Sequence, residues 1–417
     1  MLVARQRFPE APALDLPARI REQLARVLGR IQPRSRIAVA VGSRGISNLN
    51  CIVGAVVEGL QAAGARPFIV PAMGSHGGGT PEGQAALLAE YGITEGLLGA
   101  PIEAAIEVES LGTTANGFEV FFSAAALRAD GIVLVNRIKP HTDFTGTIGS
   151  GLLKMLVVGL GKPRGAANFH AAASRLGYEA VLRQTARLLL ARTPVLCGLG
   201  IVENQRHQTA KLAGLLPTEL ESHEAALCTE ARALMPRLPL EDIDLLIVDR
   251  LGKNISGAGM DPAVTGRSIH GYVLQQETPA PPPRVRRLFV RDLTPQTHGN
   301  ATGIGLADFT TTRLVQAIDW HVTALNALTA LSLQGSKVPL HFETDRQAIG
   351  AALRTLALPP GARPVVARIR DTLSLDLMEL SEAAWDQAQS QPGLELASGA
   401  ANMAFEPDGN LVAFRAG

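Results

Sequence analysis

The chain has 417 residues, of which 46% are apolar and 18% are charged, as is typical of a folded globular enzyme rather than a disordered or fibrous protein. The net charge is +1 and no Lys- or Arg-rich block is present, so composition excludes an extended electrostatic site for nucleic acid. Aromatic residues make up only 4%, which argues against a surface on which bases stack. At roughly 150 residues per domain, this length predicts about two to three domains.

The cysteines and the N-terminus predict the compartment. Three widely spaced cysteines form no Cys-x-x-Cys pair, which favours buried free thiols in a reducing compartment over disulfides or a zinc–thiolate site; they are Cys51, Cys197 and Cys228. The first residues show neither the apolar region nor the cleavage site of a secretory signal. No stretch approaches 18 uninterrupted apolar residues. We therefore expect a cytoplasmic protein that does not associate with a membrane.

Short β-branched runs alternate with longer amphipathic stretches, which is typical of α/β proteins with mainly parallel sheets. The predicted strands are 36–42, 66–72, 131–136, 194–202, 244–249, 287–293, 338–343 and 362–370. The predicted helices are 50–64, 81–91, 174–192, 219–235, 311–327 and 345–356. A proline-punctuated segment at 235–244 predicts the boundary between two α/β domains, 1–238 and 239–417, with the active site in the cleft between them.

Three predicted strands run directly into polar, glycine-rich loops. The loops are 41–48, 71–80 and 136–146. Because open parallel sheets bind ligands outside the carboxyl ends of their strands, these loops are the candidate site. They carry Arg44, His76, and Lys139 with His141. The glycines around His76, in "GSHGGGT", also allow backbone N–H groups to approach an anion ahead of the next helix.

Four histidines are candidates for chemistry. A neutral imidazole is both the commonest nitrogen ligand of metals and the usual acid or base near neutral pH. His76, His141 and His170 therefore admit two roles each, and their spacing alone does not assign them. His298 lies in the glycine-rich stretch "TPQTHGNATGIGLADF" and is a candidate to face the cleft.

Lys154 lies in the apolar run "IGSGLLKMLVVGLGK". A phosphate-binding loop of the type GxxxxGK[ST] is excluded, because that motif would require glycine at Leu156 and Ser or Thr at Pro163. A surface lysine whose stem covers apolar surface is the ordinary alternative. Flanking glycines imply close backbone approach to something large; they are Gly149, Gly151, Gly159 and Gly161. Apolar surroundings also make a lysine easier to deprotonate, and hence reactive.

Taken together, "GSHGGGT", "KPHTDFTG", "GLLKMLVVG" and "NFHAA" resemble the nickel-dependent lactate racemase family, whose cofactor is the nickel-pincer nucleotide. The resemblance covers roughly residues 30–175 well and the rest only loosely. It implies that Lys154 is the covalent anchor, joined as a thioamide to the Ni(II) pyridinium-3-thioamide-5-thiocarboxylic acid mononucleotide. It further implies that His170 ligates nickel and that His76 and His141 are the acid/base pair.

The resemblance also implies further contacts with the cofactor and the substrate. The nucleotide would be held at the end of the first strand by Ser43 and Arg44, and in the second loop by Gly74 and Ser75. Cationic groups would hold the substrate carboxylate, and the candidates for substrate contact are Lys139, Lys253 and His298. Lys253 lies in "VDRLGKNISGAGMD", which occupies the position of a family loop that contributes a lysine to the cleft.

The implied activity is that of an isomerase, a racemase or epimerase acting on a 2-hydroxy acid such as lactate or a larger acid, for example an aldonate. Hydride transfer from the substrate to the cofactor and back to either face would exchange the enantiomers, and each face requires its own imidazole. Val41, Gly45 and Val158 depart from the family pattern, as does a longer gap between His141 and Lys154, and together they indicate a divergent branch. Expected partners are the small-molecule acid and, transiently, cofactor-maturation enzymes. Whether the chain forms a homo-oligomer stays open.

Two other interpretations of the same residues stay open. In the first, His76, His141 and His170 bind zinc directly in a hydrolase or lyase, and Lys154 is only structural. In the second, the chain binds a nucleotide or cofactor without catalysing a reaction.

Overall fold

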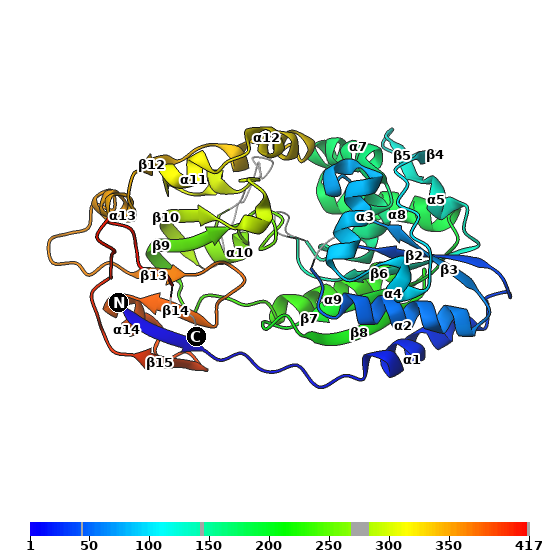
Figure 1. Cartoon of the computed structure of the whole chain (residues 1–417), viewed down its shortest axis with the longest axis horizontal. Coiled ribbons are helices and arrows are strands. Elements are labelled where there is room, and N and C mark those ends of the chain that lie inside the picture. Colours follow the sequence, from blue (N-terminus) through cyan, green and yellow to red (C-terminus); the bar gives the residue numbers. More distant parts are fainter. Residues whose placement is uncertain (43–44, 142–145, 268–282, 415–417) are drawn as a thin grey trace. The chain divides into compact units, whose positions relative to one another are not determined.

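The computed structural model describes residues 1–42, 45–141, 146–267 and 283–414. The chain divides into two compact units, which we call the Lys154 unit, Glu10–Met235, and the C-terminal unit, Met1–Pro9 with Pro236–Gly417. Both contain a mainly parallel sheet with helices, so the predicted α/β fold class is confirmed (Figure 1). No helix in the described ranges is both long and apolar enough to cross a membrane.

The Lys154 unit is built on a five-stranded sheet with the order β3-β2-β6-β7-β8, parallel except for the last pair. Its strands are β2 (Arg36–Val41), β3 (Arg66–Pro71), β6 (Gly131–Arg137), β7 (Val195–Glu203) and β8 (Thr209–Leu215). A separate hairpin consists of β4 (Val108–Thr113) and β5 (Glu119–Ser123). The helices of the Lys154 unit are α1 (Leu16–Leu28), α2 (Leu49–Ala62), α3 (Pro81–Glu90), α4 (Glu95–Leu98), α5 (Ala124–Leu127), α6 (Leu152–Lys154), α7 (Lys162–Leu176), α8 (Tyr178–Arg192) and α9 (Leu220–Ala233).

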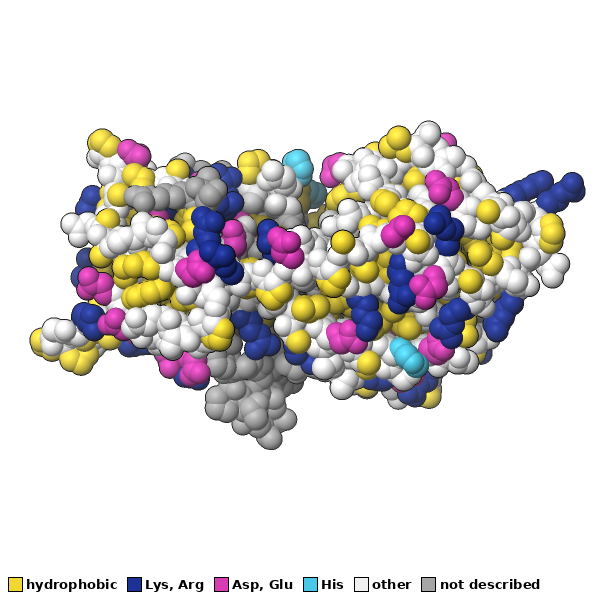
Figure 2. Space-filling view, turned by 90° about the horizontal axis from the view of Figure 1, so that it is seen from below, with side chains coloured by type: hydrophobic (Ala, Val, Ile, Leu, Met, Phe, Trp, Pro, Cys, Tyr) yellow, Lys and Arg dark blue, Asp and Glu magenta, His cyan; other side chains and the backbone are white. Residues whose placement is uncertain are grey.

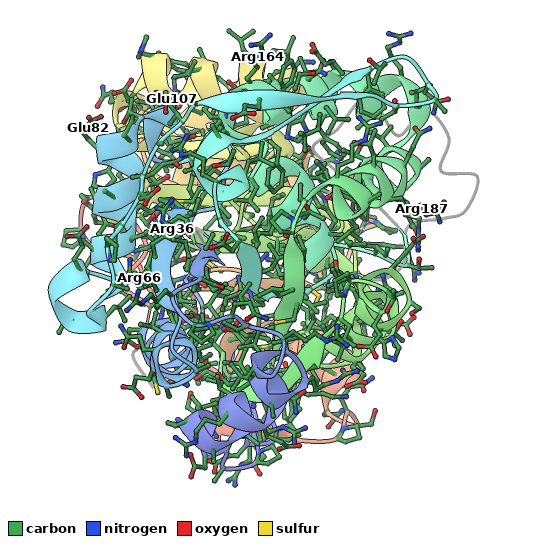
Figure 3. The ribbon with its side chains drawn as sticks, turned by 90° about the vertical axis from the view of Figure 1, so that its right-hand side faces the viewer. Arg36, Arg66, Glu82, Glu107, Arg164 and Arg187 are labelled. Carbon is green, nitrogen blue, oxygen red and sulfur yellow. The ribbon has the colours of Figure 1, made fainter. Side chains whose placement is uncertain are left out.

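Both faces of this sheet are buried, which explains why its strands are continuous apolar runs in the sequence. Along β2, Ile37 and Val39 pack with α1 and α2 on one face. Ala38 and Ala40 pack on the opposite face, in the cluster that α7, α8 and α9 complete. Arg164 of α7 is labelled in Figure 3. Its guanidinium lies 4.1 Å from the centre of the Phe121 ring of β5 and so helps to hold the β4–β5 hairpin to α7.

The C-terminal unit has an eight-stranded sheet with the order β12-β11-β10-β9-β13-β14-β1-β15. The pairs from β12 to β13 are parallel, and those from β13 to β15 are antiparallel. The strands are β1 (Leu2–Gln6), β9 (Asp242–Leu251), β10 (Arg284–Leu293), β11 (Phe309–Thr311), β12 (Leu340–Phe342), β13 (Val366–Ile369), β14 (Leu377–Leu380) and β15 (Leu394–Ser398). The helices are α10 (Pro262–Thr265), α11 (Thr312–Gln316), α12 (Trp320–Thr329), α13 (Asp345–Arg354) and α14 (Glu382–Ala388).

The N-terminal strand β1 belongs to the sheet of the C-terminal unit, although the sequence division into 1–238 and 239–417 assigned it to the first domain. It lies between β14 and β15 and pairs antiparallel with both, for example Ala4 with Met378. The residues of β1 pair with residues of β14 that lie more than 370 positions further along the chain. The local sequence of β1 does not show such distant pairing, so it could not assign the strand to this unit.

On the face shown in Figure 2, Lys and Arg side chains are interspersed with Asp and Glu side chains. This mixture agrees with the small net charge of +1. The protein has several surface ion pairs, among them Arg363 with Asp386 at 2.9 Å. Pairs of this kind contribute only about 0–1 kcal/mol each because water and salt screen them.

A buried ion cluster holds the C-terminal segment of the chain against α13. The Asp345 carboxylate is fully buried and accepts hydrogen bonds from Arg291 and Arg313, each at 2.7 Å. It also accepts from the Leu411 backbone N–H at 2.8 Å. We expect Asp345→Ala to lower the free energy of unfolding by about 3–5 kcal/mol, because the two guanidinium groups lose a desolvated partner.

Urea unfolding of Asp345→Ala beside Asp386→Ala checks this expectation. Asp386 belongs to an exposed pair, so its removal should change the stability by at most about 1 kcal/mol. Equal stability losses in the two variants would contradict the structural role assigned to the buried cluster.

Candidate active site at the carboxyl edge of the Lys154 sheet

Lys154 is the last residue of the short helix α6 and is followed by a π-helical turn, Met155–Gly159. In this turn the Leu160 N–H donates to the carbonyl of Met155, five residues earlier, at 2.8 Å. Single π-turns inside α-helical segments are rare and occur frequently at functional sites. The Lys154 side chain is half-buried while its neighbours Leu153 and Met155 are buried.

The loop after β6 brings His141 to Lys154. The Lys139 N–H donates to the Ser150 carbonyl at 2.9 Å, and the Ser150 N–H returns a bond of 2.8 Å to Lys139. This pair of hydrogen bonds closes the loop at its base and places His141 Nε2 2.8 Å from Lys154 Nζ. Despite the long sequence gap between the histidine and the lysine, the two predicted site residues are in contact.

Tyr178, which no sequence motif singles out, lies beside both His141 and Lys154. Its ring centre lies 4.6 Å from that of His141 and 6.0 Å from Lys154 Nζ. Its side chain is buried at the start of α8, and its hydroxyl lies 3.5 Å from the Gly149 carbonyl oxygen. The sequence feature that marks Tyr178 is the preceding Gly177. This glycine has a positive φ of 86° and ends α7, so Tyr178 is the first residue of α8.

His170 is linked to the same aromatic cluster through its neighbour on α7. The Phe169 ring packs edge-on against Tyr178, with centres 5.5 Å apart, and against His170 at 5.6 Å. Edge-to-face aromatic contacts of this kind add about 0.5–1.5 kcal/mol each beyond the area they bury. The aromatic chain therefore fixes α7, and with it the half-buried His170, against the residues that contact Lys154.

The turn that carries His76 packs on the π-helical turn after Lys154. The Gly74 N–H donates to the Gly159 carbonyl at 3.0 Å, and Gly74 has a φ of 59°. A Cβ at this position would be strained by the positive φ and would lie 3.2 Å from the Val158 carbonyl oxygen, which is a tight contact. Ser75 and His76 are half-buried next to it.

The glycines around Lys154 approach the protein itself rather than leaving room for a ligand. A Cβ on Gly149 would lie 2.3 Å from the Lys139 carbonyl, and one on Gly159 would lie 2.6 Å from the Ala72 carbonyl. A Cβ on Gly151 would lie 2.3 Å from a carboxylate oxygen of Glu224. The glycines therefore do mark close approach, and at these positions the groups approached are the protein's own backbone and Glu224.

Glu224 on α9 is a fully buried carboxyl group beneath helix α6. Its Oε2 accepts from the Leu153 N–H at 2.9 Å, and its Oε1 is buried without a hydrogen-bond partner among the described residues. Burial raises the pKa of Glu224 to about 7, and the backbone bonds from Leu153 and Leu152 oppose that rise. The backbone ahead of Lys154 is therefore held by a carboxyl group that gains a proton within the neutral pH range.

The raised pKa of Glu224 predicts how stability depends on pH. Between about pH 4.5 and 7 the unfolded chain loses this proton while the folded chain keeps it, so stability falls as the pH rises through that window. The total loss is of the order of 3 kcal/mol, at 1.36 kcal/mol per pKa unit. In Glu224→Gln this loss should disappear, so the stability difference between the variant and the unmodified chain should shift in the variant's favour between pH 4.5 and pH 8.

Chemical denaturation of both proteins at the two pH values measures the shift. Because each comparison is made at one pH, other titrating groups cancel. A stability difference that is the same at pH 4.5 and pH 8 would contradict the raised pKa.

The described residues contain no group of three or more His, Cys, Asp and Glu side chains placed to hold a metal ion. Within those ranges, His76, His141 and His170 are not grouped as the three-histidine site that the zinc-hydrolase interpretation expects. A single imidazole ligand, the role expected of His170, does not require such a group.

The remaining predicted contacts are distributed over the chain. Ser43 and Arg44 lie outside the described residues. Lys139 stands at the base of the His141 loop and is half-buried. Lys253 and His298 belong to the C-terminal unit, in the loops after β9 and β10, where the Lys253 N–H donates to Thr297 Oγ1 at 3.2 Å. Lys253 Nζ donates to the Gly257 carbonyl at 2.5 Å, and His298 is exposed with a φ of 49°.

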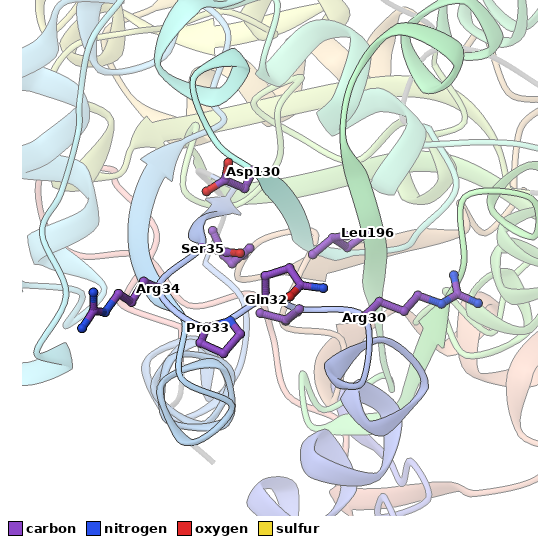
Figure 4. A pocket seen from close by; sticks show the side chains of 9 residues that line it. Arg30, Gln32, Pro33, Arg34, Ser35, Asp130 and Leu196 are labelled. Atoms are coloured by element: carbon purple, nitrogen blue, oxygen red, sulfur yellow. The ribbon is translucent and has the colours of Figure 1, made fainter.

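A cavity of about 380 Å³ lies at the opposite, amino-terminal edge of the Lys154 sheet (Figure 4). Arg30, Arg34 and Asp130 contribute its charged lining. The Asp130 carboxylate already accepts from the Arg36 N–H at 2.7 Å, where β2 begins. Since open parallel sheets bind ligands at their carboxyl ends, this cavity is not the candidate active site.

No protein-family model matches the sequence, and no curated protein matches it significantly. Among solved structures, the chain is similar to the lactate racemase apoprotein from Thermoanaerobacterium thermosaccharolyticum, with a TM-score of 0.48 and 12% sequence identity. The alignment covers 90% of this chain and 99% of that one.

Proposed function

We propose that the protein is an isomerase that racemises or epimerises a 2-hydroxy acid with a nickel-pincer nucleotide attached to Lys154. The observation that carries the proposal is the 2.8 Å contact between Lys154 Nζ and His141 Nε2 at the carboxyl edge of a parallel sheet. An amine beside an imidazole suits a site in which the lysine anchors a cofactor and the histidine accepts and returns a proton of the substrate bound there.

The donor set fits such a cofactor. The half-buried Lys154 amine is the anchor, and the half-buried imidazole of His170 is a nitrogen ligand of a type that suits nickel. Tyr178 packs on His141 and lies near the Lys154 amine, so it limits the orientations of both. The nucleotide contacts assigned to Ser43, Arg44, Gly74 and Ser75 belong to this proposal, although Gly74 is already close to the Val158 carbonyl.

When bound, the cofactor supplies an acceptor that takes hydride from the substrate Cα and returns it. The chain supplies the proton chemistry: His141 Nε2 takes the hydroxyl proton of one enantiomer as the Cα–H bond breaks, and His76 serves the other enantiomer. Each imidazole returns its proton when the planar 2-keto acid is reduced again. A cationic side chain of the same unit, Arg44 or Lys139, holds the substrate carboxylate.

The proposal is tested on protein co-expressed with the enzymes that make the cofactor. Single enantiomers of lactate, larger 2-hydroxy acids and aldonates are incubated with it in D₂O and separated by chiral chromatography. We expect one of them to give its mirror-image or epimeric product with the Cα hydrogen retained, because hydride transfer does not exchange with solvent. Deuterium at Cα would indicate proton abstraction instead, and no conversion of any acid would favour a binding protein without turnover.

A further inference from the structure

Lys162, which the proposed reaction does not use, combines two unfavourable features in one residue. Its side chain is fully buried, and its backbone has a φ of 57°, in the left-handed region that non-glycine residues rarely adopt. Burial lowers the pKa of Lys162 to about 8, against the opposing charge of Glu107. Such costs persist only where the surrounding structure requires the group, and they cluster at functional sites.

The contacts of Lys162 lead to the turn that carries His76. Its Nζ donates to the Pro71 carbonyl at the end of β3, at 2.7 Å, and to Gln84 Oε1 on α3, at 3.2 Å. An ammonium group has donors only, so it fixes which end of the Gln84 carboxamide faces it. The other end, Nε2, then points to the turn and donates to the carbonyls of Gly74 at 3.0 Å and His76 at 3.3 Å.

The start of α3 and the start of α7 enclose the same turn. Thr80 caps α3 by accepting from the Gly83 N–H at 3.1 Å. A Cβ on Gly79 would lie 3.2 Å from Pro163, the residue after Lys162. Gln84, like Lys162, is fully buried, so its hydrogen bonds to the turn do not compete with water.

We propose that Lys162 and Gln84 are a positioning pair that sets the backbone of the His76 turn through the chain Lys162–Gln84–His76. The proposal deepens the proposed function and rests on it, because the value of fixing this turn depends on the role of His76 as an acid/base. A neutral side chain at residue 162 would leave the Gln84 carboxamide able to reverse, which would place its oxygen against the two carbonyls of the turn.

Two variants separate this role from general stability. Gln84→Glu keeps an acceptor for the Lys162 ammonium but replaces the donor to Gly74 and His76 with a second oxygen. Lys162→Met removes the ammonium while keeping a buried side chain of similar length. The matched control is Gln184→Glu, the same chemical change on α8, where Gln184 Oε1 accepts from Asn116 at 3.0 Å.

Hydrogen exchange of the full chain without cofactor, followed by mass spectrometry, reads out the turn. The amides of Gly74, His76 and Gly79 each donate to a backbone carbonyl. In Gln84→Glu we expect the 73–79 segment to exchange at least about tenfold faster, with unchanged exchange in α8, because two buried hydrogen bonds of the turn are lost. Unchanged exchange of this segment in a folded Gln84→Glu variant would overturn the proposal.

Because the exchange measurement needs neither substrate nor cofactor, its failure is distinguishable from failure of the proposed function. In the loaded enzyme, Gln84→Glu should lower kcat with KM little changed, since the turn holds an acid/base. Faster exchange without any racemase activity in the unmodified chain would uphold the positioning pair and reject the proposed function. A Lys162→Met protein that folds with normal exchange in 73–79 would also contradict the pair.

Discussion

Lys154→Met is expected to abolish the proposed racemisation, with a loss of at least about 10⁴-fold, because enzymes accelerate reactions by about 10⁶-fold or more and the proposed cofactor would supply the hydride chemistry here. Methionine matches the length and apolar stem of lysine and so suits this half-buried position. It offers no amine for covalent attachment. The measurement is the turnover of the best substrate by variant and unmodified protein, each co-expressed with the maturation enzymes.

Two controls restrict the explanation of that result. Lys154→Arg keeps the positive charge near His141, but a guanidinium does not form the thioamide, so it should be as inactive as Lys154→Met. Lys211→Met removes a lysine that pairs with Glu230 at the surface, at 2.7 Å, and should keep full activity. Substantial turnover by Lys154→Arg would mean that charge rather than attachment is what the site needs.

His141→Gln is expected to lower kcat by about 10²–10⁴-fold, the usual contribution of a positioned acid/base. The glutamine carboxamide still offers Lys154 a hydrogen-bonding partner, so the effect isolates the loss of proton transfer. Because the two enantiomers of a racemised acid are equally stable, kcat/KM must fall by the same factor from either enantiomer.

Initial rates from each enantiomer, measured by chiral chromatography, check the His141 prediction. The matched control is His223→Gln on α9, where the imidazole lies at the surface 3.3 Å from the Glu219 carbonyl. A His141→Gln enzyme within a few-fold of normal activity would remove His141 from the acid/base pair.

Much of the fold could be predicted because buried parallel strands are continuous apolar runs. All eight predicted strands correspond to observed ones, for example 131–136 to β6 and 244–249 to β9. The predicted helix 174–192 is instead α7 and α8, separated at Gly177. The strand β4, with the half-exposed sequence "VESLGT", carries no comparable signal, because its pairing with β5 rather than burial defines it.

The site was predictable where residue type and spacing carry the chemistry, and not where packing does. The contact between His141 and Lys154 joins two residues that the motifs single out. Tyr178 and Glu224 act from α8 and α9 and look like ordinary helix residues in the sequence. The glycines around Lys154 could be predicted only in part. Their pattern indicates close approach, but it does not indicate that the groups approached are the protein's own backbone and Glu224.

The intact mass and metal content of the chain, purified after co-expression with the cofactor's biosynthetic enzymes, test the central claim most directly. We predict a mass adduct equal to the nickel-pincer nucleotide, about one nickel per chain, and loss of both in Lys154→Met. Peptide mapping should place the adduct on Lys154, and His170→Ala should retain the adduct but hold less nickel. An unmodified chain that binds zinc, and loses it in His170→Ala, would contradict the account.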